Sequence, residues 1–254
     1  MKFGIFIKCP QIEIIETCGI SNLDFVVIDM EHTPLGPSDL KPLALAAEVR
    51  KLDVMLRIPV NKEEYFKWAL DLGFKHIQVP QVKSAIDATN AIKEAFFYPK
   101  GERGLCRFVR ASNYSHKDKD EYLFDSTNDV QLTLQIEGCD GVKNIDEILS
   151  VSGVQSIMIG PYDLSQSLGI PGDIWDKRVV DEMMIIIKKC KNMKIKVGTF
   201  TDTIYGLKFW YKHGVDFIQY SSDMSLFLES LSKIKKQLNG EKGYEGYSIN
   251  DRKK

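Results

Sequence analysis

The sequence predicts an α/β protein folded as a single-domain (β/α)8 barrel, the TIM-barrel architecture. Short apolar runs recur along the chain, at residues 3–7, 25–29, 54–59, 76–81, 132–137, 156–161, 195–200 and 217–222. Most of these runs are apolar without interruption, as in strands buried on both faces of a parallel sheet. Eight such runs in 254 residues match the strand count and the size of this barrel. A doubly wound open sheet is the alternative.

The segments between these runs have helical spacing and helix stop signals. Ser38 is expected to cap a helix over residues 39–51. Helices over residues 62–73 and 203–214 are expected to stop at the glycine that ends each segment. The longest irregular stretch, residues 98–129, precedes the fifth strand and is interpreted as a functional βα-loop insertion.

The chain shows no internal repeat and no sign of a domain boundary. We therefore expect one barrel domain over residues 1–238. Residues 239–254 are polar and glycine-rich, which predicts a flexible tail.

Composition excludes several classes of protein. With Lys+Arg 34 against Asp+Glu 35, the net charge of -1 offers no basic surplus for nucleic acid or an anionic membrane. No apolar run reaches the roughly 18–20 residues that span a bilayer, and the apolar start of the chain is too short for a signal peptide. The five cysteines are scattered and form no CxxC pair, which indicates reduced thiols and a cytoplasmic location.

Polar side chains gather where the expected strands end, which is the catalytic face of such a barrel. They are Asp29, Glu31, His32, Arg57, Gln81, Gln135, Glu137, Asp163, Ser221, Ser222 and Asp223. Of the four histidines, His32 alone falls at such a strand end. We therefore interpret His32 as functional, with a satisfied structural histidine as the alternative.

Two of these carboxylates are placed to bind a metal. Glu137 and Asp163 follow consecutive strands, so they can converge on one hard divalent cation such as Mg²⁺. Arg57 adds a permanent cation for a carboxylate or enolate oxygen. The alternatives are two solvated acids at the rim, and an ion pair between Arg57 and one of them. Lys8 is the best-placed lysine for imine chemistry, which we rank below metal chemistry.

The ordered set of segments resembles a known family. The segments are DFVVIDMEHTP, LRIPVN, LDLGFKHIQVPQV, YPKGERG, LQIE, GVQSIMIGPYDLSQSLGIPG and SSDMSLF, and together they reach from near the N-terminus to the last expected helix. They resemble the metal-dependent, pyruvate-specific class II aldolases, such as 2-dehydro-3-deoxyglucarate aldolase and 4-hydroxy-2-oxoheptanedioate aldolase. This family shares a superfamily with citrate lyase β subunits and malyl-CoA lyases.

The resemblance implies a role for each matching residue. Glu137 and Asp163 correspond to the metal ligands, with Mg²⁺ expected first and Mn²⁺ or Co²⁺ as alternatives. Arg57 corresponds to the arginine that stabilises the enolate. His32 corresponds to the acid–base histidine, and Asp29 to the aspartate that orients it.

The resemblance also implies a substrate site and an oligomer. Gln135 is expected near the pyruvate, and Gly160 and Tyr162 of the GPYD segment are expected beside it. Asp71 corresponds to an aspartate that reaches the histidine of a neighbouring subunit. Asp71 precedes the fourth strand, so it faces the wrong end of its own barrel. The family forms homo-oligomers, trimers or hexamers, with the last helix exchanged between partners.

The sequence departs from the family pattern in the expected pocket wall. Met30 stands where glycine is usual, Tyr162 where alanine is usual, and Gln81 where methionine is common. The segment LCRFVRAS replaces a stretch of small residues, although Arg110 in it still matches. The bulk of Tyr162 and the added cation of Arg107 are interpreted as suiting a different aldehyde.

The reaction implied is the reversible aldol cleavage of a 4-hydroxy-2-oxo acid to pyruvate and an aldehyde. His32, acting through a water, takes the proton of the C4 hydroxyl, and Arg57 and the metal stabilise the enolate. Glu31 either supports the water shell of the metal or pairs with a nearby cation. Two rival functions remain: a CoA-thioester lyase of the same superfamily, and a non-catalytic barrel that acts as a binding or assembly protein. The histidine of the EHxP motif favours the aldolase over the first rival.

Overall fold

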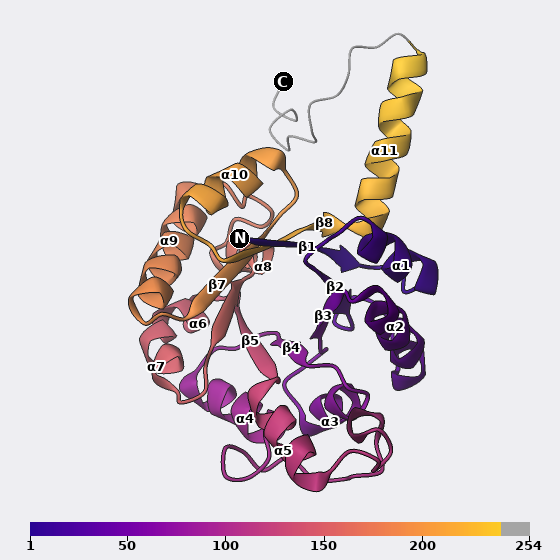
Figure 1. Ribbon diagram of the computed structural model, residues 1–254. Coiled ribbons are helices and arrows are strands. Elements are labelled where there is room, and N and C mark those ends of the chain that lie inside the picture. The colour runs from indigo at the N-terminus through magenta and orange to yellow at the C-terminus, as the bar shows by residue number, and fades with distance from the viewer. Residues whose placement is uncertain (240–254) are drawn as a thin grey trace.

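The fold is a closed barrel of eight parallel strands that neighbour one another in chain order (Figure 1). The computed structural model describes residues 1–239. The strands are β1 (Lys2–Ile7), β2 (Phe25–Asp29), β3 (Asp53–Arg57), β4 (His76–Val79), β5 (Gln131–Ile136), β6 (Ser156–Ile159), β7 (Lys196–Thr201) and β8 (Phe217–Ser222). β1 pairs with both β2 and β8, so the sheet closes on itself. The predicted barrel is confirmed, and its strands coincide with the predicted apolar runs to within a few residues.

Helices connect the strands and surround the barrel (Figure 1). They are α1 (Ile12–Ile20), α2 (Pro37–Arg50), α3 (Glu63–Asp71), α4 (Ala85–Ala95), α5 (Lys119–Asn128), α6 (Cys139–Lys143), α7 (Ile145–Ser150), α8 (Pro161–Ser167), α9 (Lys177–Asn192), α10 (Ile204–Lys212) and α11 (Asp223–Leu238), with the 3-10 helix η1 (Arg110–Ser112). No helix within residues 1–239 combines the length and the apolar character that crossing a membrane requires. The predicted tail, apart from Asn239, lies outside the described residues.

The barrel strands are buried on both faces, which explains their uninterrupted apolar runs. In β2, Val26 and Ile28 pack into the core between the strands and the helices. Their neighbours belong to a second core inside the barrel, formed by Phe6, Phe25, Val27, Met55, Met158 and Phe217. Because side chains alternate along a strand, the next inward position of β2 is Asp29, at its carboxyl end. The same alternation aims polar side chains of other strands into the top of the barrel.

The first turn of α2 differs from the prediction. The helix begins at Pro37 with Gly36 as its N-cap, so the expected cap at Ser38 is wrong. The backbone N–H of Gly36 donates to the Asp39 carboxylate at 2.8 Å. A proline fits the first helical position because the N–H it lacks would have no partner in the helix.

The long stretch before β5 also differs from the prediction. It follows α4, so it is an αβ connection at the amino ends of the strands rather than a βα loop on the catalytic face. Its second half is helical: it forms α5, where the side chain of Asp118 accepts the backbone N–H of Asp120 at 2.8 Å. The placement of this stretch as a βα-loop insertion is therefore wrong.

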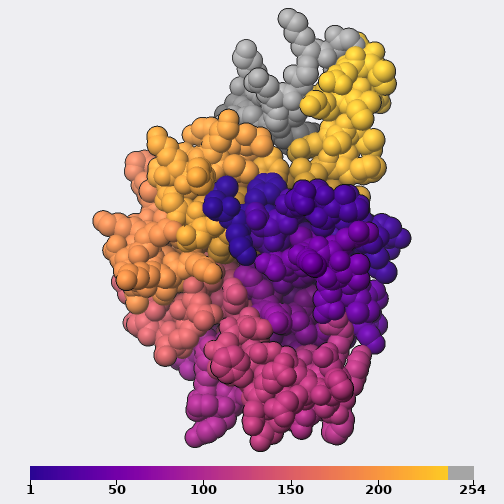
Figure 2. All heavy atoms as spheres, in the orientation of Figure 1, coloured from indigo at the N-terminus to yellow at the C-terminus, as the bar shows by residue number. Residues whose placement is uncertain are grey.

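The last helix, α11, stands out from the barrel (Figures 1 and 2). Asp223 is its one buried residue, and its carboxylate accepts the backbone N–H groups of Lys8 and Cys9, both at 2.9 Å. Large apolar side chains of the helix are exposed at Met224, Phe227, Leu228, Leu231, Ile234 and Leu238, which are mostly three or four residues apart. This spacing puts them on one face, which we call the α11 stripe.

Candidate active site

A pocket of about 330 Å³ opens at the carboxyl ends of the strands. It is lined by Phe6, Lys8, His32, Arg57, Gln135, Met158, Gly160, Pro161, Tyr162, Asp163, Phe200, Asp202, Ser221, Ser222 and Ser225. The pocket thus brings together six of the residues to which the resemblance assigns a role: His32, Arg57, Gln135, Gly160, Tyr162 and Asp163. Asp29 and Glu137 lie directly behind its wall, where they contact Arg57 and Gln135.

Asp29 is the buried anchor of the two pocket cations. Its carboxylate is fully buried and accepts a hydrogen bond from Arg57 Nε at 2.8 Å, while Lys8 forms an ion pair with the other oxygen. Burial alone would raise the pKa of Asp29, but the hydrogen bonds and charges of Arg57 and Lys8 lower it to about 2. Asp29 is therefore ionised throughout the neutral range and fixes both cations. An ammonium paired in this way is a poor nucleophile, which weakens the imine alternative.

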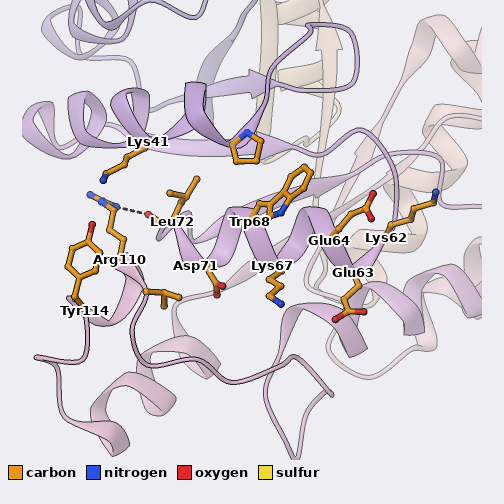
Figure 3. A pocket seen from close by; sticks show the side chains of 12 residues that line it. Lys41, Lys62, Glu63, Glu64, Lys67, Trp68, Asp71, Leu72, Arg110 and Tyr114 are labelled. Atoms are coloured by element: carbon orange, nitrogen blue, oxygen red, sulfur yellow. Dashed lines mark hydrogen bonds between the residues drawn. The ribbon is translucent and has the colours of Figure 1, made fainter.

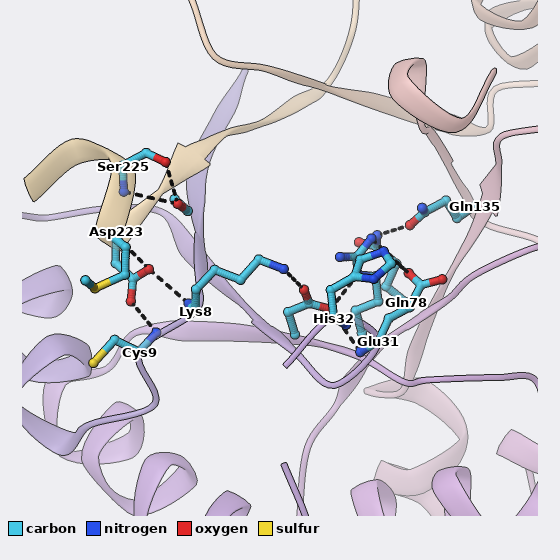
Figure 4. A network of polar contacts seen from close by, with 12 residues as sticks. Lys8, Cys9, Glu31, His32, Gln78, Gln135, Asp223 and Ser225 are labelled. Atoms are coloured by element: carbon cyan, nitrogen blue, oxygen red, sulfur yellow. Dashed lines mark hydrogen bonds and ion pairs between the residues drawn. The ribbon is translucent and has the colours of Figure 1, made fainter. Parts of the chain in front are cut away.

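His32 lies at the mouth of the pocket, with 60% of its side chain exposed. The backbone N–H groups of Glu31 and His32 point at Asp29 Oδ1, at 3.0 and 3.4 Å. Asp29 therefore positions His32 through the main chain. The acid nearest to the ring is Glu31, whose Oε2 lies 3.8 Å from His32 Nε2 (Figure 4).

Glu31 pairs with a cation, one of the two roles left open by its sequence. Its Oε2 lies 3.0 Å from Arg57 Nη1. Burial raises the pKa of Glu31 above its usual range, although the charge of Arg57 opposes this rise. Arg57 is thus held by two carboxylates, those of Asp29 and Glu31, in one orientation.

Glu137 is held in place by two N–H donors. The backbone N–H of Gln81 donates to Oε1 at 2.7 Å, and the side-chain amide of Gln135 donates to Oε2. Gln81 has a φ of 58°, a left-handed conformation that is uncommon outside glycine and is found at functional sites. Burial raises the pKa of Glu137 to about 7. The two hydrogen bonds oppose this rise, whereas the nearby charges of Glu31 and Asp163 add to it.

Behind this carboxylate runs a chain of buried amides that the sequence did not reveal. The side-chain amide Nε2 of Gln78 donates to Oε1 of Gln135, and Nε2 of Gln219 donates to Oε1 of Gln78 at 2.6 Å. Gln78 and Gln219 are fully buried inside the barrel. The sequence feature that could have revealed Gln78 and Gln219 is a polar residue at an inward position in the middle of a strand, where an apolar residue would otherwise fill the core. The chain fixes the orientation of Gln135 and, through it, that of Glu137.

The donor set at the pocket fits a hard divalent cation. The Asp163 carboxylate lines the pocket and forms no hydrogen bond or ion pair with another residue in the range 1–239. Glu137 is buried near this second carboxylate, so a cation between them would offset their repulsion. No cluster of three or more His, Cys, Asp or Glu side chains suited to a metal occurs among the described residues. Two carboxylates are what Mg²⁺ uses when water and substrate oxygens complete its shell.

The comparison with known proteins agrees with this geometry. Residues 2–230 match the family described as HpcH/HpaI aldolase/citrate lyase. The chain belongs to this family. It is 28% identical to a 2-dehydro-3,6-dideoxy-6-sulfogluconate aldolase of Pseudomonas putida, over 95% of this chain and 94% of the relative. It is also 28% identical to a 5-keto-4-deoxy-D-glucarate aldolase of Salmonella paratyphi A, over 86% and 85%.

The fold of the HpcH/HpaI family is shared closely. The crystal structure of a family protein from Burkholderia cenocepacia J2315 aligns with a TM-score of 0.90 at 26% identity. The alignment covers 94% of each chain. The barrel and its connections are therefore those of the family.

In this HpcH/HpaI protein, Asp71 lies away from the pocket. It ends α3 and accepts a hydrogen bond from Arg103 Nη2 at 2.7 Å. It lines a separate open groove of about 770 Å³, together with Trp68, Leu72 and Arg110 (Figure 3). Arg110 is engaged there, since its Nη1 donates to the Leu72 carbonyl at 2.6 Å. The groove and the pocket share no lining residue.

Arg107 is also remote from the pocket. Its Nη2 donates to the carbonyl of Lys117 at 2.9 Å within the connection before β5. Arg107 does not line the pocket of its own subunit. Arg107 therefore does not supply an additional cation to the aldehyde site of its own subunit, as had been expected.

Asp202 is a pocket residue that the sequence analysis missed. It follows β7 as Asp163 follows β6, so the rule about strand ends could have found it. The hydroxyl of Tyr162 donates to Asp202 Oδ2 at 2.7 Å. Tyr162 thus lines the pocket as predicted, with a partner that was not expected.

Proposed function

We propose that this HpcH/HpaI family member catalyses the reversible aldol cleavage of a 4-hydroxy-2-oxo acid to pyruvate and an aldehyde. It is a carbon–carbon lyase of the aldehyde-lyase class. The observation that carries the proposal is one pocket lined by Asp163, Arg57 and His32, with the carboxylate of Glu137 directly behind its wall. The names of the two relatives given above, both aldolases of keto-deoxy sugar acids, support the same reaction.

The pyruvate half of the reaction needs stabilisation of an enolate. A divalent cation held by Glu137 and Asp163 would supply a Lewis acid at the keto oxygen, with Mg²⁺ preferred over Mn²⁺ or Co²⁺. Arg57 points a fixed guanidinium at the oxygen on which negative charge develops as the C3–C4 bond breaks. Gln135 and the main chain at Gly160 orient the pyruvate. Because Asp29 and Glu31 already hold Arg57, little reorganisation accompanies the charge development.

The aldehyde half needs a proton acceptor. In the cleavage direction, His32 takes the proton of the C4 hydroxyl. In the reverse reaction, in which pyruvate adds to the aldehyde, His32 returns the proton to the aldehyde oxygen. General base catalysis of this kind contributes on the order of 10²–10⁴-fold.

The exposed ring of His32 at the pocket mouth leaves room for a further group. We propose that Asp71 of a neighbouring subunit contacts it in a trimer or hexamer in which α11 is exchanged between partners.

The compartment proposed is the cytoplasm. All five cysteines are free thiols in the structure, and two of them, Cys18 and Cys190, are buried. Free thiols suit a reducing compartment.

The decisive experiment is an aldol assay with pyruvate and a panel of small aldehydes, with and without EDTA. We expect EDTA to abolish product formation and added Mg²⁺ to restore it. Glu137→Gln should lower kcat by at least roughly 10²-fold because a neutral amide is a weak ligand for a hard cation. Glu147→Gln, an exposed position in α7, is the matched control and should behave as the wild type. Full activity under chelation, or a pyruvate adduct trapped by borohydride, would contradict the proposal.

A further inference from the structure

One side of the pocket is formed by β6, β7 and β8 and the residues that follow them. It is lined by Tyr162, Phe200, Asp202, Ser221, Ser222 and Ser225. In the strand order of the barrel, β7 lies across from β3, which carries Arg57. This wall is therefore on the far side of the pocket from the arginine that stabilises the enolate.

A fixed carboxylate belongs to this wall. The Tyr162 hydroxyl donates to Asp202 Oδ2 at 2.7 Å, and the Tyr162 ring packs against Phe200 with ring centroids 5.8 Å apart. The hydrogen bond and the ring contact therefore fix Tyr162 beside Asp202.

The charge of Asp202 has no counter-ion among the described residues. Its hydrogen-bond partner there is the neutral hydroxyl of Tyr162. The two cations of the pocket, Lys8 and Arg57, are both paired with Asp29. A group that binds beside this wall therefore meets a carboxylate with no cationic side chain paired to it among residues 1–239.

We infer that Asp202 and Tyr162 select a neutral, hydroxylated aldehyde and disfavour an aldehyde that carries a second anionic group. The inference rests on the proposed aldol function and specifies its aldehyde. Asp202 Oδ1 accepts no hydrogen bond from residues 1–239, so it can accept one from an aldehyde hydroxyl. The serine hydroxyls of the wall can donate or accept further hydrogen bonds. An anion at the same place would meet a like charge, which disfavours its binding.

The reaction that uses this aldehyde is balanced without an oxidant or reductant. In the addition direction, a proton leaves C3 of pyruvate and the C3 electron pair forms a bond to the aldehyde carbon. The aldehyde oxygen then takes up a proton and becomes the C4 hydroxyl. Asp202 acts on the remainder of the aldehyde, not on the bond that forms.

The test compares two acceptors of equal carbon number, neutral glycolaldehyde and anionic glyoxylate, with pyruvate and Mg²⁺. Asp202→Asn keeps an oxygen for the Tyr162 hydroxyl but removes the charge. We expect the ratio of kcat/KM for glyoxylate over glycolaldehyde to rise at least about tenfold over the wild-type ratio. Asp53→Asn removes the same charge at the amino end of β3, and we expect it to keep the wild-type ratio.

Two further measurements separate the inference from the proposed function. Asp202→Ser removes the charge in a smaller side chain and should shift the ratio in the same direction. Exchange of the pyruvate C3 protons with deuterated solvent, measured on the wild type, reports on enolate formation without any aldehyde. Exchange together with an unchanged ratio in either folded variant would overturn the inference and leave the function standing. The absence of both exchange and products would overturn the function itself.

Discussion

Gly160 is the residue where a single methyl group should disturb the proposed chemistry. A Cβ at this position would lie 2.9 Å from both Cβ and Oε2 of Glu137. Gly160→Ala should therefore displace the carboxylate and lower kcat/KM by roughly 10- to 100-fold, because misplacing a catalytic group by about 1 Å has effects of that size. The measurement is aldol activity as a function of Mg²⁺ concentration.

Gly104→Ala is the matched control for this substitution. A Cβ at Gly104 would meet no atom within 4 Å. We expect wild-type kinetics for this variant. If Gly160→Ala also behaved as the wild type at limiting Mg²⁺, the proposed metal site at Glu137 would be misplaced.

A second residue-scale prediction concerns stability at the other end of the barrel. His76 begins β4, and its Nε2 lies 2.8 Å from Thr133 Oγ1. Burial lowers the pKa of His76 from 6.5 to about 4. Between these values the unfolded chain binds more protons than the folded protein. The contribution of the neutral His76 side chain to the free energy of unfolding is therefore fully present above pH 6.5 and is lost as the pH falls toward 4. Its size is about 2 kcal/mol, a value reduced because the ring is partly exposed.

Urea unfolding at several pH values checks this prediction. His76→Gln should flatten the decline in the free energy of unfolding between pH 6.5 and 4. His116→Gln, at an exposed position, should leave the decline as it is in the wild type. An equal slope in the wild type and in His76→Gln would show that another group causes the acid sensitivity.

The identity of the site residues could be predicted from the sequence, whereas their contacts could not. Asp29, His32, Arg57 and Glu137 stand out because charges at the end of an apolar strand need partners. Which partner each one meets depends on how the strands are staggered around the barrel. The structure therefore decides that Asp29 holds the main chain of His32, and that the imidazole faces Glu31.

At the scale of the elements, the strands were predictable because burial on both faces leaves a strong local signal. The connection before β5 carries no such signal. Its helix α5 is polar, with Tyr122 as its one buried residue, so its sequence reads as a charged loop. The order of the elements shows on which side of the barrel this connection lies. A segment that follows a helix and precedes a strand lies at the amino ends of the strands. Asp202 was overlooked because the predicted run for β7 stopped at residue 200, one residue short of the strand end at Thr201.

The α11 stripe gives a prediction for a whole element. Its exposed apolar side chains need a cover, and the proposed exchange of α11 between subunits would supply one. Leu228 is 63% exposed within the described chain. Leu228→Glu should therefore convert the oligomer to smaller species, as light scattering coupled to size exclusion would show. Ser232→Glu adds the same charge away from the stripe and should preserve the oligomer. An unchanged mass for Leu228→Glu would place the subunit interface elsewhere.

At the scale of the whole molecule, the barrel divides its polar groups between two ends. Residues that follow strands form the pocket, whereas Asp71, the last residue of α3, lines a separate groove beside that helix. A single barrel cannot bring Asp71 to His32, because a closed, packed barrel core separates its two ends. The proposed catalytic contact between Asp71 and His32 therefore requires two subunits. They must be oriented so that Asp71 of one barrel faces His32 of the other.

Mixing two inactive variants tests this requirement. His32→Ala and Asp71→Asn should each lose most activity alone. In a mixed oligomer, a subunit with an intact His32 can meet a neighbour with an intact Asp71. Random assembly at equal amounts should then restore about a quarter of the wild-type sites. The measurement is aldol activity before and after the two variants are dissociated together and reassembled. Arg103→Gln removes the intramolecular partner of Asp71 but keeps both His32 and Asp71, so it is the control for loss of that ion pair and should stay active by itself. If the mixture stayed inactive although mixed oligomers had formed, Asp71 would serve its own subunit through Arg103 and not the active site of a neighbour.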